Sequence, residues 1–392
     1  MNETKILNER PQCPHAKSCG GCQLQNMSYP RQLEWKQAKV VREIGKFCRV
    51  EPIMGMDEPY NYRNKVQAAF GRDGRGRIIS GVYQSSSHRI VSVDKCMIED
   101  RTADKIIVTI RKMLPEFKLT AYDERTCQGF LRHVLVKRGF ATNEVMVVLV
   151  VSNPIFKNQK PFIRKLLELH PEITTIVMNI NDKFTSLVLG KQEKVLFGKG
   201  YIEDICCGCR FRISAKSFYQ INPVQTEKLY NTAVDYAALT GKETVLDAYC
   251  GIGTIGMVAS RKAGKVAGVE LNADAVKDAI YNAKLNDIKN CWFTCADAGQ
   301  FMERMASEGE SADVVFMDPP RAGSDKRFLE SLIHMGPRRV VYISCNPETL
   351  SRDLEILVKG GYKAVKAQPV DMFPHTNHIE CVVCLVKQST AR

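Results

Sequence analysis

The residues best suited to chemistry are a cysteine and a downstream carboxylate. Cys345 follows the apolar run 339–342 within the sequence ISCNP, and Glu380 ends the later sequence HTNHIE. A thiolate that adds to C6 of uracil makes C5 nucleophilic toward a sulfonium methyl group, and a base must then remove the C5 proton before the thiolate can leave. Cys345 is therefore a candidate nucleophile and Glu380 a candidate base. If a strand follows Pro374, His378 lies on the same face as Glu380.

Each of these residues also has a simpler explanation. A cysteine at a strand end is usually a small buried side chain, and a lone glutamate is usually a solvated surface group. Asp318 changes this balance, because it follows the apolar run 314–317 and begins the sequence DPPR. A carboxylate and a rigid double proline at the carboxyl end of a strand are typical of a ligand crevice. The three segments together favour catalysis.

A glycine-rich turn after another predicted strand indicates a nucleotide-type cofactor. Residues 245–246 lead to Asp247, and the sequence AYCGIGT then enters a predicted helix. Gly251 and Gly253 within it let a ligand approach the backbone. Glu270 closes the next strand, where a carboxylate can accept hydrogen bonds from both ribose hydroxyls.

Two kinds of cofactor could bind at this turn. Together with Gly256, its glycines fit the dinucleotide fingerprint, which would indicate a hydride-transfer enzyme. That fingerprint follows its strand almost at once, whereas Asp247 and three further residues intervene here, and Asp297 and Asp318 end later segments. This pattern resembles S-adenosylmethionine enzymes, whose cofactor has no pyrophosphate, and we expect that methyl donor.

Cysteines near the N-terminus form a candidate metal site. Cys13, Cys19 and Cys22 are closely spaced around two glycines, and Cys96 is the candidate fourth ligand. Such thiolates can hold a [4Fe-4S] cluster or a zinc ion, and the single Cys-x-x-Cys unit favours the cluster only slightly. A second group of cysteines, within 206–209, lacks a clear fourth ligand, so we expect it to be structural or incidental.

Composition bounds the remaining possibilities. The 392 residues are 44% hydrophobic, which allows two buried cores, and a net charge of +13 with a pI near 9.0 favours a polyanionic partner. The apolar runs are too short for membrane spans, and residues 1–10 lack the apolar core of a secretory signal. We therefore expect a cytoplasmic protein whose 15 cysteines are thiols or metal ligands.

The strand and helix patterns predict an α/β chain with two domains. Alternating segments and glycine turns in the first half indicate a largely antiparallel α+β domain, with strands within 60–93 and at 131–138, 144–151, 174–179 and 185–189, and helices at 32–47 and 160–168. After residue 218, helices alternate with strands at 244–246, 265–269, 314–317 and 340–344, which predicts a Rossmann-like, doubly wound, parallel-rich sheet. We place the boundary within 208–217 and assign residues 1–212 and 213–392 to the two domains.

The chain resembles the RNA uracil-5-methyltransferases, in particular their iron-sulfur-containing 23S ribosomal RNA branch. The resemblance runs from Cys13 to about Leu385 and rests on the segments 13–25, 218–222, 247–253, 318–321, 344–347 and 375–380. It implies that Cys345 is the nucleophile and Glu380 the base. It also implies a [4Fe-4S] cluster on Cys13, Cys19, Cys22 and Cys96. The implied S-adenosylmethionine site lies beside the turn of Gly251 and Gly253 and is lined by Gln220, Tyr249, Glu270, Asp297 and Asp318.

By this resemblance the substrate is a uridine of ribosomal RNA that leaves its unpaired loop to enter the site. Transfer RNA relatives generally lack the cysteine cluster, so the cluster favours ribosomal RNA. A transfer RNA enzyme is the first alternative, and a dinucleotide-dependent iron-sulfur oxidoreductase is the second. An RNA-binding assembly factor that keeps the fold without turnover is a further alternative, which the presence of both Cys345 and Glu380 argues against.

RNA binding has to use a surface of these two domains. Many relatives carry an N-terminal RNA-binding barrel, which we do not expect in this sequence. The basic segment 60–93, interleaved with Tyr62, Phe70 and Tyr83, is instead expected to hold phosphates and stack bases. A solvated basic sheet face is the alternative explanation of this segment. We expect a monomer.

Overall fold

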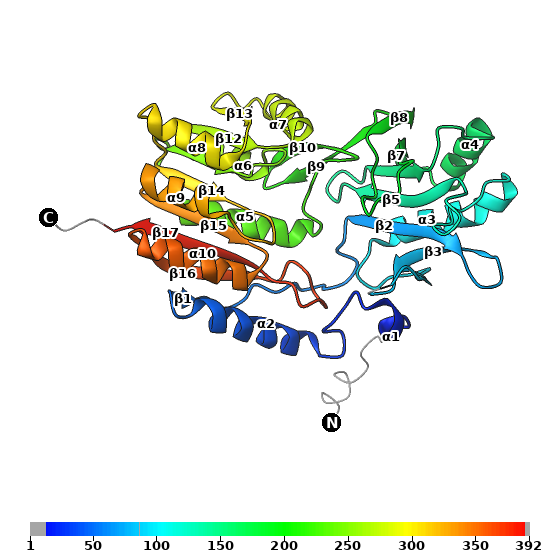
Figure 1. Ribbon diagram of the computed structural model, residues 1–392, viewed down its shortest axis with the longest axis horizontal. Coiled ribbons are helices and arrows are strands. Elements are labelled where there is room, and N and C mark those ends of the chain that lie inside the picture. The colour runs from blue at the N-terminus through cyan, green and yellow to red at the C-terminus, as the bar shows by residue number, and fades with distance from the viewer. Residues whose placement is uncertain (1–12, 86, 389–392) are drawn as a thin grey trace.

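The computed structural model describes residues 13–85 and 87–388 as two modules that lie side by side (Figure 1). One is built on an eight-stranded sheet and the other on a seven-stranded sheet, and a two-stranded hairpin lies where they meet. Residues 1–10, which we expected to carry no secretory signal, lie outside the described residues. Within the described part of the chain, no helix is long and apolar enough to cross a membrane.

The eight-stranded sheet has the order β1-β16-β17-β15-β14-β11-β12-β13. Every neighbouring pair in it is parallel except the two pairs made by β17. Its strands are β1 (Arg49–Val50), β11 (Thr244–Ala248), β12 (Lys265–Glu270), β13 (Cys291–Cys295), β14 (Val314–Met317), β15 (Arg339–Ser344), β16 (Tyr362–Val370) and β17 (Glu380–Lys387).

Helices cover both faces of this sheet, because each strand alternates its apolar side chains between the faces. Val245 of β11 packs in a core with α5, α6 and α7, whereas its neighbour Leu246 packs with α2, α8, α9 and α10. The predicted α/β class and doubly wound sheet are confirmed. The helices are α2 (Tyr29–Ile44), α5 (Pro223–Ala237), α6 (Thr254–Ser260), α7 (Ala273–Leu285), α8 (Ala298–Ser307), α9 (Lys326–Met335) and α10 (Pro347–Lys359).

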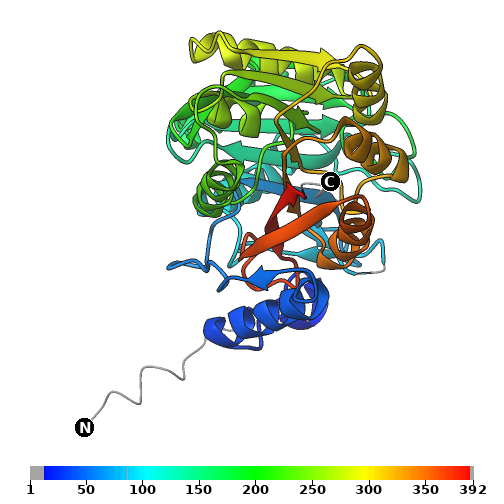
Figure 2. The same cartoon turned by 90° about the vertical axis from the view of Figure 1, so that its left-hand side faces the viewer.

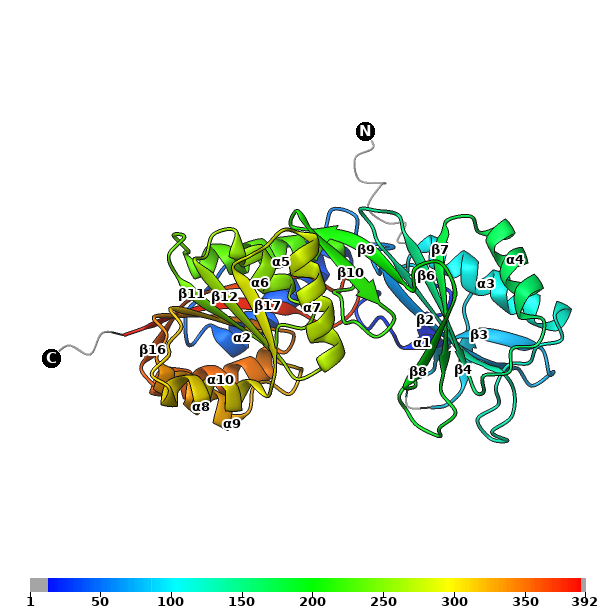
Figure 3. The ribbon, with the colours of Figure 1, turned by 90° about the horizontal axis from the view of Figure 1, so that it is seen from above.

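The seven-stranded sheet of the other module has the order β4-β3-β2-β5-β6-β7-β8 and is antiparallel apart from the pair β6 and β7. α3 and α4 cover one face, and the hairpin β9–β10 packs on the other (Figure 3). The elements are α1 (Ala16–Cys19), β2 (Lys65–Arg72), β3 (Ile78–Tyr83), β4 (Ile90–Ser92), α3 (Arg101–Glu116), β5 (Leu131–Arg138), β6 (Val145–Val151), α4 (Gln159–Leu169), β7 (Ile173–Ile180), β8 (Gln192–Phe197), β9 (Tyr201–Cys206) and β10 (Cys209–Ser214).

One predicted strand of this module is wrong. Residues 185–189 end in the apolar run 187–189, yet they belong to a loop. The side chain of Asn181 donates to the carbonyls of Leu187 (2.7 Å) and Val188 (3.0 Å), which turns the backbone back on itself. The strand that completes the sheet is β8, farther along the chain.

The N-terminal residues contribute to the eight-stranded sheet. β1 pairs in parallel with β16, and α2 packs beside α10 with Val40 and Ile44 fully buried (Figure 2). The helix begins and ends three residues before the predicted range 32–47. The domain division at residues 212 and 213 stays a prediction. The seven-stranded sheet lies wholly before it, whereas the eight-stranded sheet takes β1 from before it and its other strands from after it.

Candidate active site

Antiparallel pairing brings the candidate nucleophile and base together. β15 ends at Ser344, directly before Cys345, and β17 begins at Glu380. The register pairs Ser344 with Cys381. Cys345 and Glu380 are therefore the next residues along two neighbouring strands, at the edge of the sheet where the parallel strands have their carboxyl ends.

The turn around Cys345 is fixed by its neighbours. The hydroxyl of Ser344 accepts a hydrogen bond from the Asn346 N–H (3.2 Å), and the Asn346 side chain caps α10 by accepting from the Glu348 N–H (3.1 Å). Pro347 occupies the first helical turn, where its missing N–H costs nothing. The Asn346 amide also donates to the carbonyl of Arg321 (3.4 Å), which ties the DPPR segment to this turn.

The charges around Cys345 oppose its ionisation. Burial raises the pKa of its thiol to about 11, the carboxylates of Glu380 and Asp318 add to the rise, and the guanidinium of Arg321 lowers it. The sulfur therefore needs either a proton acceptor or a bound substrate that changes this balance before it can attack.

Two buried carboxyl groups lie at the same edge. Glu380 is 4% exposed, and burial together with Asp318 raises its pKa well above the usual range, while Arg321 lowers it. Burial raises the pKa of Asp318 to about 7. Asp318 directly follows β14, whose last residue, Met317, pairs with Tyr342 of β15. Two buried carboxyl groups with raised pKa values beside a thiol are typical of a catalytic site.

The loop 371–379 leads into Glu380, and helix α2 holds it in place. The expectation that His378 shares a strand face with Glu380 is wrong, because the strand begins only at Glu380. Lys36 of α2 donates to Asp371 Oδ1 (2.6 Å) in a fully buried ion pair, and also to the carbonyl of Phe373 (2.9 Å).

His375 fixes the middle of this loop. Its backbone N–H donates a hydrogen bond to Gln32 Oε1 (2.9 Å). The ring Nε2 lies 3.0 Å from the carbonyl of Pro59, so this nitrogen carries the proton, and Nδ1 accepts from the Gln32 amide (3.2 Å). The ring also stacks on Tyr60, with centroids 4.8 Å apart.

Candidate cofactor residues line the same sheet edge. Asp247, in β11, accepts from the Gly256 N–H (2.8 Å), and burial raises its pKa to about 7. Glu270 accepts from the N–H groups of Gly251 (3.1 Å) and Asn272 (2.8 Å). A β-carbon added at Gly251 would meet no atom within 4 Å, so open space adjoins the backbone beside the Glu270 carboxylate. A ligand can therefore approach the backbone at this turn.

Gly253 has a packing role in this turn. Its φ of +83° favours glycine, and a β-carbon there would approach Phe293 to 2.8 Å and Met257 to 2.6 Å. The glycine therefore lets the turn pack closely against the sheet.

The other predicted cofactor residues are only partly brought together. Tyr249 donates to or accepts from Ser324 (3.0 Å), and Asp297, whose charge acts on Tyr249, caps α8 by accepting from the Gln300 N–H (3.0 Å). Gln220 is 7% exposed, and its carbonyl accepts from Asn64 (2.9 Å) of the other module. This hydrogen bond joins the backbone of Gln220 to the other module and does not place its side chain at the glycine turn.

The four N-terminal candidate ligands come from two segments that meet. The charges of Cys13 and Cys19 act on Cys22, and Cys22 and Cys96 pack against the same apolar group of Met56, Tyr62 and Ile98. No three of the four sulfur atoms lie within 4.8 Å of one another in the described part of the chain, where only Cys206, Cys207 and Glu227 form such a set.

The sequence of most of the chain matches a known protein family. Residues 28–388 match the tRNA (uracil-5-)-methyltransferase family. The chain belongs to this family. It is an S-adenosylmethionine-dependent RNA methyltransferase, and its substrate is RNA. This excludes the dinucleotide-dependent oxidoreductase that the glycine turn also allowed.

Two sequence relatives and one solved structure agree with this assignment. The chain is 46% identical to an uncharacterised RNA methyltransferase of Halalkalibacterium halodurans, over 95% of this chain and 82% of the relative. It is 44% identical to another from Oceanobacillus iheyensis, over 97% and 84% of the two chains. The solved structure of the Pyrococcus abyssi tRNA (uracil-54, C5)-methyltransferase with S-adenosyl-L-homocysteine superimposes with a TM-score of 0.77 at 28% identity, over 94% of this chain and 86% of that one.

For this family member, sequence reasoning missed the polar residues that support the site. Gln32 and Lys36 are buried although both are polar, and they hold the loop before Glu380. A signal was present, because they follow the same four-residue spacing as the apolar Val40 and Ile44 and so lie on one face of α2.

Proposed function

We propose that this enzyme methylates C5 of a uridine in 23S ribosomal RNA through a transient bond between Cys345 and C6 of the base. The observation that carries the proposal is the position of Cys345 and Glu380 on adjacent paired strands, with Asp318 at the same edge. A thiol beside a buried carboxyl group supplies both the nucleophile and the base that this reaction needs.

The reaction balances with these two side chains. The Cys345 thiolate forms a bond to C6, and the electron pair of the C5–C6 double bond is released toward the C4 carbonyl. That electron pair then forms the bond from C5 to the methyl group of S-adenosylmethionine, whose sulfur–methyl bond would break to release S-adenosylhomocysteine. The Glu380 carboxylate then removes the C5 proton, the double bond re-forms, and the C6–sulfur bond breaks to regenerate the thiolate.

Several residues fit the methyl donor. We assign its binding to Gln220, Tyr249, Gly251, Gly253, Glu270, Asp297 and Asp318. Support comes from the open space over Gly251 and from the Glu270 carboxylate at the end of β12, which is placed to accept from ribose hydroxyls. Gln220 has the least support, since its contacts are with Asn64.

We assign a [4Fe-4S] cluster to Cys13, Cys19, Cys22 and Cys96. Bonds of about 2.3 Å to one zinc ion keep its sulfur ligands within about 4.6 Å of each other, whereas a four-iron cluster binds each thiolate at a separate iron. Among the described residues no three of these sulfurs have the close spacing of a zinc site, so their spacing gives zinc no support. Arg63 acts electrostatically on Cys22, and its Nε is buried without a hydrogen-bond partner among the described residues, which suits an anionic neighbour.

The cluster loop has a structural connection to the active site. Directly after Cys22, the Leu24 N–H donates to the carbonyl of His375 (2.9 Å), and the side chain of Gln23 accepts from the Asn377 N–H (3.3 Å). Both partners belong to the loop that leads into Glu380. A cluster that orders residues 13–22 therefore also supports the catalytic base, without any electron transfer.

The RNA target has two candidates. Ribosomal RNA is favoured by the cysteine cluster, and transfer RNA by the likeness to the archaeal tRNA enzyme. In either case we propose that the enzyme is a monomer in the cytoplasm and that the target uridine leaves its loop to reach Cys345, because C6 is hidden in a stacked helix. The basic segment 60–93 contributes differently from our expectation, since Tyr62 and Phe70 are buried and cannot stack on bases.

Mapping the modified base tests the proposal. Deletion of the gene should remove 5-methyluridine from one or more sites of 23S ribosomal RNA, and the purified enzyme should restore it with S-adenosylmethionine. Loss of the base from transfer RNA alone would support the second candidate. If neither RNA loses 5-methyluridine, the proposal is wrong.

A further inference from the structure

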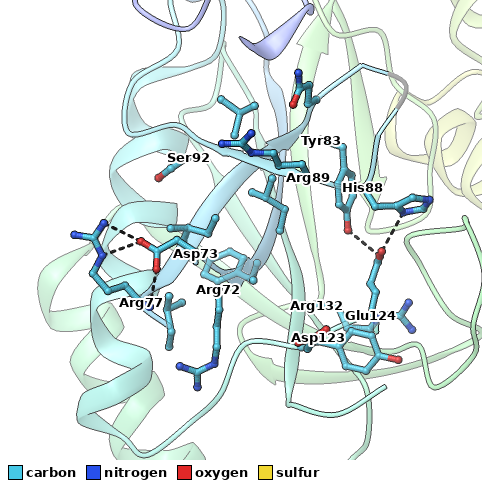
Figure 4. Close-up of a pocket in the computed structure, with 18 of the residues that line it drawn as sticks. Arg72, Asp73, Arg77, Tyr83, His88, Arg89, Ser92, Asp123, Glu124 and Arg132 are labelled. Atoms are coloured by element: carbon cyan, nitrogen blue, oxygen red, sulfur yellow. Dashed lines mark hydrogen bonds and ion pairs between the residues drawn. The ribbon is translucent and has the colours of Figure 1, made fainter. Parts of the chain in front are cut away.

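A pocket lies in the N-terminal module, and none of the residues assigned to catalysis or cofactor binding lines it. Its volume is about 1200 Å³. The walls come from β2, β3 and β4, from the segment 122–125, from the start of β5, from α1 and from the loop 181–190 (Figure 4). Lys17 and Ser18 of α1 belong to the cluster loop, so the pocket adjoins the proposed iron-sulfur site.

The pocket has an excess of positive charge. Seven basic and four acidic side chains line it. Three of the acids are already neutralised by arginines, in the pairs Asp73–Arg77 (2.8 Å), Asp94–Arg111 (2.7 Å) and Asp123–Arg125 (3.4 Å). Within the described residues, no carboxylate forms an ion pair with Lys17, Arg72, Arg89 or Arg132. These four cations leave the pocket suited to a polyanion.

The fourth acidic side chain, Glu124, belongs to a hydrogen-bonded part of the pocket wall. Glu124 accepts from the hydroxyl of Tyr83 (2.9 Å) and lies 3.1 Å from His88 Nδ1 (Figure 4). The ring of Tyr83 meets His133 edge-on, with centroids 6.3 Å apart. His133 is 6% exposed and its Nδ1 has no hydrogen-bond partner in the part of the chain that the structure describes. Burial lowers the pKa of His133 to about 4, so the ring is neutral.

An exposed aromatic side chain stands at the rim. Phe184 lines the pocket and is 82% exposed, on a loop that is anchored at several points. Arg132 donates to the carbonyls of Asn181 and Lys183, both at 2.7 Å, and its guanidinium lies over the ring of Tyr122 at 4.5 Å. A phenyl ring held in water by an anchored loop loses little entropy when a ligand covers it.

We propose that this pocket binds an unpaired nucleotide of the substrate RNA, with the base stacked on Phe184 and the phosphates beside Arg72, Arg89 and Lys17. Cations interleaved with an accessible aromatic face are the arrangement that holds single-stranded nucleic acid. The inference rests on the proposed action at a uridine of a large RNA. It adds a contact outside the flipped base, which sets affinity for long RNA and leaves the chemistry to Cys345.

Steady-state kinetics on a ribosomal RNA fragment and on a short stem-loop test this role. Since stacking of one base is worth about 1–3 kcal/mol, Phe184→Ala should raise KM for the long fragment about tenfold while kcat changes less than twofold. Phe184→Tyr should retain nearly normal KM. Ile155→Ala, an equally simple change at an exposed apolar residue outside the pocket, should have no effect. An unchanged KM for Phe184→Ala, or an equal rise for Ile155→Ala, would overturn the inference.

Binding without turnover separates this inference from the proposed function. Fluorescence anisotropy with the same RNA should show that Arg89→Gln weakens binding and reduces the slope of log K against log salt by about one. If the parent enzyme makes no 5-methyluridine in any RNA, the proposed function fails, whereas the pocket inference fails if the parent enzyme methylates RNA and these variants bind it equally well.

Discussion

Glu380 lies beside Cys345 on the neighbouring strand, each residue one position beyond the Ser344–Cys381 pair that ends the β15–β17 ladder. The two groups affect each other, because a charge on Glu380 raises the pKa of the Cys345 thiol. Arg321, on the segment that follows β14, lowers the pKa of both. The pair and this arginine together determine when the sulfur can attack and when the carboxylate can accept a proton.

Removal of the base should trap the covalent intermediate. In Glu380→Gln the amide cannot take the C5 proton, so turnover should fall by about 10²–10⁴-fold and the RNA should remain bonded to Cys345 after methyl transfer. A denaturing gel with S-adenosylmethionine and labelled RNA should show a shifted protein–RNA band. Glu355→Gln, at an exposed glutamate of α10, is the control and should show none. No shifted band with Glu380→Gln would argue against its role as the base.

The rate should rise with pH through the alkaline range. Cys345 and Glu380 act only after losing protons, and both have raised pKa values, about 11 for the thiol. Loss of the positive charge in Arg321→Gln should raise both pKa values further and move the rising limb of kcat/KM to higher pH. At pH values below the raised pKa, each unit by which that pKa increases lowers the rate about tenfold. Arg304→Gln, at an exposed arginine of α8, should leave the profile in place. An unmoved limb in Arg321→Gln would contradict this electrostatic role.

The buried pair of Lys36 and Asp371 should matter for stability. Both side chains are fully buried, so Lys36→Met leaves an uncompensated carboxylate and should lower the free energy of unfolding by about 3–5 kcal/mol. Lys46→Met breaks an exposed ion pair with Glu355 and should cost less than about 1 kcal/mol. Urea denaturation of the two variants measures the difference, and equal losses would show that the buried pair is not special.

Loss of a cluster ligand should loosen the loop before Glu380. Cys19→Ser should lose iron and the brown colour of the cluster, and should speed amide hydrogen exchange at 375–377, which the cluster loop contacts through Gln23 and Leu24. Cys127→Ser, at an exposed cysteine, should change neither. Unchanged iron content in Cys19→Ser would refute the ligand assignment. Unchanged exchange despite iron loss would refute the connection to the base.

The elements that could be predicted from the sequence are those whose determining residues lie close together in the chain. β14 has its predicted ends because a short apolar run between Asp313 and Asp318 defines it. β5 also has its predicted ends, although its sequence LRHVLVKR mixes apolar and basic residues. Cys345 directly follows β15, as the apolar run before it predicts. Helix α3 was not predicted, although Asp100 caps it by accepting from the N–H groups of Thr102 and Ala103. Its apolar residues nevertheless recur at helical spacing along one face, so the signal was present in the sequence.

Long-range contacts could not be predicted. Nothing local in the sequence reveals that Lys36 reaches Asp371, or that Leu24 contacts His375, because these partners lie more than 300 residues apart. The strand predicted at 185–189 is wrong for a related reason, since side-chain hydrogen bonds from Asn181 satisfy backbone carbonyls of this segment and no strand ladder forms there.

The most direct measurement of the central claim is the yield of 5-methyluridine from Cys345→Ala, quantified by mass spectrometry of digested RNA after incubation with S-adenosylmethionine. Cys48→Ala, at a partly buried cysteine outside the site, is the matched control. We predict that Cys345→Ala forms no detectable 5-methyluridine while Cys48→Ala retains normal activity. Formation of the modified base by Cys345→Ala at the parent rate would contradict the covalent mechanism.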